Sequence, residues 1–165
     1  IDKYETIWPC ASSWRPHKRV DENIRYFLEH SEPEDGLIIA GSADKRYEHD
    51  RIHYVDQLST QKLFSLYKAS KYFLHLAWLD HCPNVVVDAK ACGCQIICSS
   101  AGGTKEIAGP DATIILEDEW DLSPVELYNP PPLDFSYKVN NKWHINNEWK
   151  MESVAQKYYN FISGD

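Results

Sequence analysis

The sequence predicts an α/β fold: a doubly wound, Rossmann-like parallel sheet of about six strands with helices on both faces. Short apolar segments alternate with segments of helical periodicity up to residue 116. The short segments are apolar throughout, which is typical of parallel strands that helices cover on both sides. A chain of 165 residues with 43% hydrophobic content is long enough to bury a core of this kind.

The predicted core extends over residues 4–116, and we interpret the whole chain, 1–165, as one domain. Pro9 weakens the first strand, because proline cannot donate to a ladder of hydrogen bonds. The expected strands are residues 4–11, 37–40, 52–55, 72–76, 95–99 and 112–116.

Three helices connect these strands. The apolar residues of 20–30 recur at the three- and four-residue spacing of a helix. Ser59 can cap a second helix that continues to about residue 70. A third helix has Pro83 in its first turn, where a missing N–H costs nothing, and ends at Gly93, which suits the left-handed conformation at a helix end.

Regular patterning stops after the core. Residues 117–146 form an irregular, proline-rich surface excursion or linker, in which we interpret the acidic residues 117–121 as solvated. A C-terminal helix follows at about 148–162. Its apolar stripe is Val154, Tyr158 and Phe161.

Composition and charge exclude several classes of protein. The net charge of −8 argues against a nucleic-acid partner, because no basic surplus is available to neutralise phosphates. No segment has the length and apolarity of a membrane span. Five cysteines, an odd number, favour a reduced protein over a disulfide scaffold. We therefore expect a location in the cytoplasm or at the cytosolic face of a membrane.

Three stretches follow strands of the predicted sheet and should meet at its carboxyl edge, where α/β sheets bind ligands. The first contains Lys18, the second Asp80 ahead of a helix, and the third Gly102 and Gly103. Helix N-termini attract anions, and glycine lets the backbone approach a ligand closely. Together they predict a site for a phosphorylated ligand. The three stretches are 12–19, 77–84 and 99–105.

A zinc site is the alternative interpretation of this region. The spacing of its cysteines and histidines fits no usual set of zinc ligands, and no Asp-x-Asp motif follows a strand. We therefore expect no metal. The residues considered are His75, His81, Cys82, Cys92, Cys94 and Cys98.

A composite motif extends over the second half of the core. Asp80 and Asp88 are separated by seven residues and followed by an alanine and Gly93, then by a strand and a Gly-Gly-x-x-Glu segment that ends at Glu106. With residues 67–75, these segments resemble the C-terminal, nucleotide-sugar-binding domain of retaining glycosyltransferases of the GT-B fold, family 4 (glycosyl transferases group 1). In that family both acids are glutamates.

The resemblance implies a role for each matching residue. Asp80 would contact the donor sugar at the reacting centre, and Asp88 would hold the ribose hydroxyls. Lys18 would neutralise the donor diphosphate with Arg15, although by count the family's arginine falls on Ser13. Further donor-binding positions are Pro83, Asn84, Val85, Gly102 and Gly103.

The residue types suit this chemistry. Fixed cations and a helix N-terminus can stabilise the charge of a departing diphosphate, so no metal or other cofactor is expected. Each aspartate is one methylene shorter than glutamate, so it needs a backbone shift of order 1 Å or makes a weaker contact.

The resemblance implies the donor-binding domain of a retaining hexosyltransferase that uses a UDP- or GDP-sugar and a glycan, lipid or protein acceptor. An N-terminal domain absent from this chain would carry the acceptor site, so the chain alone would transfer little or no sugar. Two alternatives remain. One is a nucleotide-sugar epimerase or a phosphorylase on the same scaffold, the phosphorylase with a pyridoxal cofactor. The other is a non-catalytic binding or interaction module, which the replacement of both glutamates favours.

Overall fold

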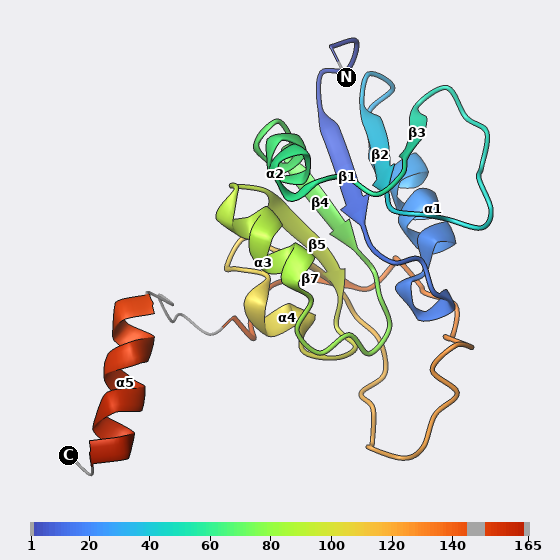
Figure 1. Ribbon diagram of the computed structural model, residues 1–165. Coiled ribbons are helices and arrows are strands. Elements are labelled where there is room, and N and C mark those ends of the chain that lie inside the picture. Colours follow the sequence, from blue (N-terminus) through green and yellow to red (C-terminus); the bar gives the residue numbers. More distant parts are fainter. Residues whose placement is uncertain (1, 145–150, 164–165) are drawn as a thin grey trace.

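The computed structural model describes residues 2–144 and 151–163 (Figure 1). The strands of this part of the chain are β1 (Ile7–Ala11), β2 (Gly36–Ala40), β3 (Ile52–Val55), β4 (Tyr72–His75), β5 (Gln95–Ser99), β6 (Thr113–Ile115) and β7 (Lys138–Asn140). The α-helices are α1 (Val20–His30), α2 (Thr60–Lys68), α3 (Asn84–Ala91), α4 (Thr104–Ile107) and α5 (Met151–Ser163), and a 3-10 turn, η1, covers Pro16–Lys18.

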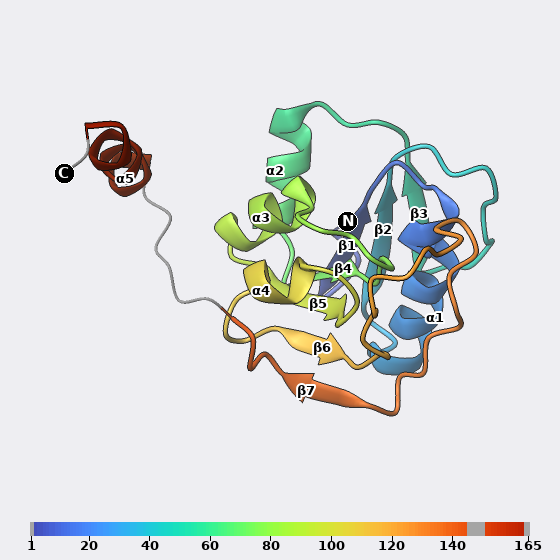
Figure 2. The same cartoon turned by 90° about the horizontal axis from the view of Figure 1, so that it is seen from below.

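The strands lie in the order β3-β2-β1-β4-β5-β6-β7 (Figure 2), and β1 to β6 run parallel. The doubly wound parallel sheet is therefore confirmed. β7 is antiparallel to β6 and was not predicted, since it lies within the excursion. Its three residues carry too little pattern to distinguish a strand from a loop.

Pro9 explains why the sheet consists of two hydrogen-bonded groups, β1–β3 and β4–β7. The carbonyl of Ile7 accepts a hydrogen bond from Lys71 N, just before β4, at 3.3 Å. Successive residues of a strand point their backbone groups to opposite sides, so Pro9 also faces β4. Its missing N–H thus falls on the seam between β1 and β4. The proline is tolerated inside the sheet because β1 keeps its hydrogen-bonded pairing with β2.

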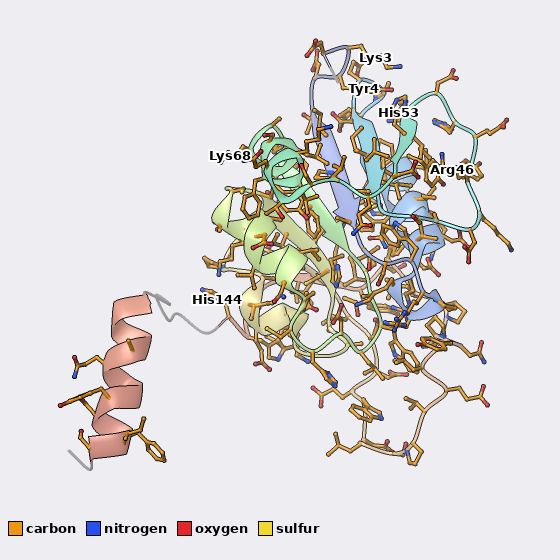
Figure 3. All side chains as sticks on the ribbon, in the orientation of Figure 1. Lys3, Tyr4, Arg46, His53, Lys68 and His144 are labelled. Carbon is orange, nitrogen blue, oxygen red and sulfur yellow. The ribbon has the colours of Figure 1, made fainter. Side chains whose placement is uncertain are left out.

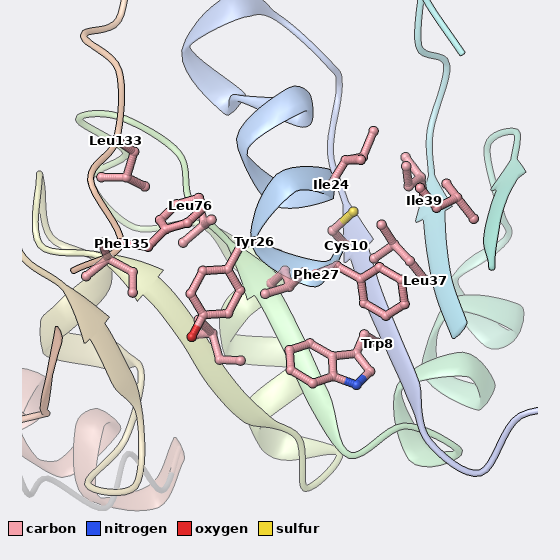
Figure 4. Close-up of a cluster of buried hydrophobic side chains, with 14 residues drawn as sticks. Trp8, Cys10, Ile24, Tyr26, Phe27, Leu37, Ile39, Leu76, Leu133 and Phe135 are labelled. Carbon is pink, nitrogen blue, oxygen red and sulfur yellow. The ribbon is translucent and has the colours of Figure 1, made fainter. Parts of the chain in front are cut away.

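One face of the sheet is covered by α1 and by part of the excursion (Figure 4). Leu133 and Phe135 are 3% and 6% exposed, and the Phe135 ring lies 5.0 Å from that of Tyr26 on α1. The prediction that residues 117–146 are a surface excursion is therefore wrong for this segment. It packs with α1 in one hydrophobic cluster against this face of the sheet.

The opposite face is covered by α2, α3 and the short α4, so helices on both faces are confirmed. Ser59 caps α2 by accepting a hydrogen bond from Lys62 N at 3.4 Å, as predicted. Pro83 lies one residue before α3, as its N-cap, rather than in the first turn. Gly93 follows α3 with φ +96°, which confirms its left-handed conformation. The single turn of α4 was not predicted.

The acidic segment also contains a buried residue, which corrects its interpretation as surface. Arg19 donates from Nη1 and Nη2 to the two carboxylate oxygens of Glu117, at 2.8 and 2.7 Å. The side chains are 1% and 9% exposed. Arg19 also donates to the carbonyl of Pro131 at 2.8 Å. This ion pair therefore attaches the excursion to the loop after β1.

The C-terminal helix predicted at 148–162 is α5, and its first predicted residues, 148–150, lie outside the described residues. The side chains of Val154 and Tyr158 lie outside them too, so the predicted stripe is described only at Phe161, which is 86% exposed. Figures 1 and 2 show α5 apart from the α/β body. Neither α5 nor any other helix within residues 2–144 and 151–163 has the length and apolarity needed to cross a membrane.

We predict that Glu117→Ala lowers the free energy of unfolding by about 3–5 kcal/mol, because it leaves Arg19 buried without its counter-charge. The measurement is urea unfolding followed by circular dichroism. Asp56→Ala is the matched control, since its pair with Arg46 is 53% and 77% exposed and worth about 1 kcal/mol or less. Equal losses in the two variants would contradict a structural role for the buried pair.

Candidate functional site

The structure brings Lys18 and Asp80 into direct contact at the carboxyl edge of the sheet. Lys18 ends η1, after β1, and Asp80 lies between β4 and α3. Lys18 Nζ donates a hydrogen bond to Asp80 Oδ2, and the side chains are 17% and 15% exposed. A second donor, Nε2 of His75 at the end of β4, lies 2.9 Å from the same oxygen. Two residues predicted separately thus form one cluster with a third.

The cluster holds Asp80 in its ionised form. Burial acts to raise the pKa of Asp80, but the hydrogen bonds from His75 and Lys18 outweigh it and keep the pKa well below its usual range. Burial lowers the pKa of His75, against the opposing effect of Asp80. At neutral pH a neutral imidazole therefore donates its Nε2–H to a carboxylate that is also paired with an ammonium group.

Backbone strain marks the same place. Arg19 and Leu79 have φ values of +53° and +52°, although neither is glycine. One follows Lys18 and the other precedes Asp80. Residues other than glycine in this region cost of order 1–3 kcal/mol and tend to gather at functional sites. Nothing in the sequence signals this strain, which depends on the tertiary structure.

Gly102 and Gly103 pack against the backbone of the loop that carries Asp80. Gly102 forms a parallel bridge with Asp80, and Gly103 N donates to the Asp80 carbonyl at 3.0 Å. A Cβ at Gly102 would lie 2.4 Å from Asp80 O, and one at Gly103 would lie 2.1 Å from His81 O. The absence of side chains at Gly102 and Gly103 thus lets two loops touch. The prediction from the sequence was that it lets a ligand approach the backbone closely.

An open cleft of about 520 Å³ lies beside the loop that carries Lys18. Ser13 and Arg15 line it from the loop after β1, Val85 from the first turn of α3, and Leu58 and Leu63 from the region of α2. Arg15 is exposed, and its Nη1 is 3.5 Å from the hydroxyl of Tyr128 in the excursion. The cleft has apolar walls with basic and hydroxyl groups at one end.

The remaining predicted residues lie along α3. Pro83 is buried and Asn84, the first residue of the helix, is exposed. Asp88 is half-buried and follows Val85 by three residues, so it lies on the same face of the helix, one turn further on. No contact with Lys18 or Asp80 is recorded for Asp88 in the described part of the chain. The structure therefore forms one charged cluster, with the cleft and α3 beside it.

No role in this cluster was predicted for His75, which was considered only as a zinc ligand, or for Arg19, which lies in the stretch 12–19. His75 had a usable signal, because it ends a predicted strand whose carboxyl end faces the site. Arg19 had none, since its partner Glu117 is 98 positions away. Within the described residues, no group of three or more His, Cys, Asp or Glu side chains could hold a metal ion. Cys98 of the considered zinc set lies buried in β5.

We predict that Gly102→Ala is much more destabilising than Gly93→Ala. Both glycines have left-handed φ values, +88° and +96°, so each alanine costs about 1–2 kcal/mol in backbone strain. Only at Gly102 would the new Cβ meet backbone atoms, since nothing lies within 4 Å at Gly93. We expect an additional loss of about 2 kcal/mol, measured by urea unfolding. Equal losses would show that the loops can separate without cost.

The family of glycosyl transferases group 1 matches residues 2–121. No curated protein matched the chain by its sequence. Among solved structures, Anabaena Alr3699/HepE in complex with UDP-glucose is 18% identical over 68% of this chain and 35% of its own, with a TM-score of 0.58.

Two further structures have the same TM-score of 0.58. Sucrose-phosphate synthase from Thermosynechococcus elongatus is 19% identical over 68% of this chain and 32% of its own. WaaG, a glycosyltransferase involved in lipopolysaccharide biosynthesis, is 18% identical over 71% of this chain and 35% of its own. The chain thus spans about a third of the length of these proteins. Likeness at this identity shows a shared fold, which is that of GT-B glycosyltransferases. Because the family match covers well over half of the sequence, the chain belongs to the glycosyl transferases group 1 family.

Proposed function

We propose that the chain is the donor-binding domain of a retaining glycosyltransferase and that it binds a UDP- or GDP-sugar at the carboxyl edge of its sheet. The observation that carries this proposal is the contact between Lys18 and Asp80, beside the first turn of α3 and an open cleft of about 520 Å³. A cation, a carboxylate and a helix N-terminus are the groups that a diphosphate-linked sugar requires.

In this arrangement the nucleoside occupies the cleft, with its ribose hydroxyls at Asp88. The diphosphate lies against Lys18, Arg15 and the N–H groups of Asn84 and Val85. The next N–H group of α3, that of Val86, already donates to the Pro83 carbonyl at 3.0 Å. The sugar reaches Asp80. When the bond between sugar and diphosphate breaks, the fixed positive charges stabilise the negative charge that develops on the leaving group.

Lys18 must change its partner in this reaction. It is paired with Asp80 in the structure, and a bound diphosphate would compete for its ammonium group. The exchange replaces one charge-assisted hydrogen bond by others, so its net cost is small. It also releases the carboxylate of Asp80 from the lysine at the moment when the donor sugar arrives.

UDP is the nucleotide to test first. Anabaena Alr3699/HepE was solved in complex with UDP-glucose, and the pneumococcal O-GlcNAc transferase GtfA, with a TM-score of 0.54 and 16% identity, was solved in complex with UDP and GlcNAc. These complexes belong to other proteins and support the choice of ligand by their fold alone.

We propose further that the reaction needs no metal and takes place in the cytoplasm or at the cytosolic face of a membrane. The acceptor would bind to an N-terminal domain outside this chain. The solved structures are about twice as long as the chain, which leaves room for such a domain. We therefore expect the chain alone to bind the donor nucleotide and to transfer little or no sugar.

The experiment is a calorimetric titration with UDP, GDP and uridine, each with EDTA and with Mg²⁺. We expect one diphosphate to bind equally well under both conditions. Lys18→Gln should lower its affinity at least tenfold, which is about 1.4 kcal/mol, and leave uridine unaffected, because the lysine contacts phosphate. Asp88→Ala should lower the affinity for the diphosphate and for uridine alike, because both ligands carry the ribose.

Lys68→Gln is the matched control, since Lys68 is an exposed lysine at the end of α2, on the far side of the domain (Figure 3). It should change none of these affinities. If neither UDP nor GDP binds, the donor-site proposal is wrong and the non-catalytic alternative is favoured. Binding that requires Mg²⁺ would overturn only the proposal that the reaction needs no metal.

A further inference from the structure

We propose that His75 is a positioning residue that holds Asp80 in place and ionised when a bound diphosphate draws Lys18 away. This inference deepens the proposed function and rests on it for the exchange of Lys18. It starts from an asymmetry at the carboxylate. Lys18 and His75 both donate to Oδ2 of Asp80, and no hydrogen bond to Oδ1 is recorded within residues 2–144 and 151–163. One oxygen is held by the protein and the other is left for a ligand.

The two donors differ in how firmly the fold holds them. His75 is the last residue of β4, is 5% exposed, and pairs in register with Cys98 of the neighbouring strand. Its ring is stacked against that of Phe73, with centroids 6.3 Å apart and planes at 12°. Lys18 lies on a 3-10 turn and carries its charge on a flexible four-carbon chain. Only the lysine can follow a ligand, so only the histidine can retain Asp80.

The charge state of His75 fits this role. The charged and titratable groups that face its ring are Asp80, Lys18 and His17, from the loop after β4 and from η1. Burial and Lys18 lower the pKa of His75, and Asp80 opposes them. The neutral ring keeps its Nε2–H as the donor, so it fixes the carboxylate without placing a second positive charge beside Lys18.

The short side chain of Asp80 belongs to the same arrangement. The family signature has glutamate at this position, with one more methylene. Leu79, in its left-handed conformation, and the bridge to Gly102 fix the backbone of Asp80 close to β4. From there an aspartate reaches Nε2 of His75 at 2.9 Å. A glutamate on the same backbone would carry its carboxylate past this donor by about 1.5 Å. The replacement thus matches the presence of a histidine at the end of β4.

The test measures the pKa of Asp80 by ¹³C NMR of its carboxyl group in a Lys18→Met background, which removes the ammonium group without any ligand and leaves no hydrogen-bond donor in its place. In this background only His75 opposes the effect of burial, so the pKa of Asp80 measured here is the reference for the His75 variants. Adding His75→Phe should raise it by at least about 1, because burial is then opposed by no donor. Adding His75→Gln should keep it low, since a glutamine amide nitrogen can occupy nearly the place of Nε2. Amide spectra confirm that each variant is folded.

His75→Asn provides a second comparison, which does not depend on whether the fold accepts a phenylalanine at position 75. Its amide falls near the place of Nδ1 rather than Nε2, so it should raise the pKa as His75→Phe does. A purely structural histidine would not distinguish the asparagine from the glutamine variant. The proposal is overturned if the pKa of Asp80 is the same with histidine and phenylalanine at this position, or if glutamine and asparagine act alike.

A final arm repeats the series with Lys18 intact and the chain saturated with UDP. The pKa of Asp80 should stay low in the wild type and with His75→Gln, and should rise with His75→Phe. A low value in the UDP-bound phenylalanine variant would overturn the role of His75 in the bound state. Failure of UDP to bind would instead count against the proposed function, while the ligand-free series would still decide whether His75 holds Asp80.

Discussion

The buried ion pair between Arg19 and Glu117 is the interaction on which the site depends. Arg19 immediately follows Lys18, and Glu117 lies just beyond β6. The same carboxylate accepts a hydrogen bond from the hydroxyl of Ser99, the last residue of β5. Burying both charges is costly, and the cost is offset only when geometry is good and further hydrogen bonds are made. The two-pronged contact and the hydrogen bonds to Pro131 and from Ser99 offset much of this cost, although Nε of Arg19 is buried without a partner. The ends of β5 and β6 are thereby fixed to the loop that presents Lys18.

Asn23 extends this network to the other half of the charged cluster. Its side-chain nitrogen donates to the carbonyls of Lys18 and Arg19, at 3.2 and 2.8 Å. Its oxygen accepts from Leu76 N, next to His75, at 3.2 Å. A single buried amide in α1 therefore sets the distance between the end of β4 and the turn that carries Lys18. The left-handed conformation of Arg19 persists because so many surrounding contacts determine it.

The fold could be predicted because its signal is local. Apolar strands, helical spacing, the cap at Ser59 and the glycine after α3 all operate within a few residues, and each is confirmed. The predicted strand order placed Lys18 and Asp80 at one edge of the sheet, but it did not predict that they touch. Glu117 was misread because an acidic run is usually solvated, and its buried partner is far away in sequence. Leu133 and Phe135 were missed because an irregular segment has no period by which to recognise its buried side.

The net charge of −8 determines how an anion could bind beside the paired Lys18 and Asp80. An anion that approaches an acidic protein is repelled at long range, so its binding depends on close contacts. Lys18 is already neutralised by a carboxylate, and Arg15 is exposed to solvent. In the proposed donor site, the attraction that a diphosphate would gain from Lys18 is therefore the difference between two ion pairs. Because Asp80 would keep its hydrogen bond from His75 Nε2, its carboxylate would lose less stabilisation when Lys18 moves to the ligand. In the proposed site the histidine would thus lower the cost of transferring Lys18 to the ligand, and the same contact that orients the carboxylate would also favour diphosphate binding.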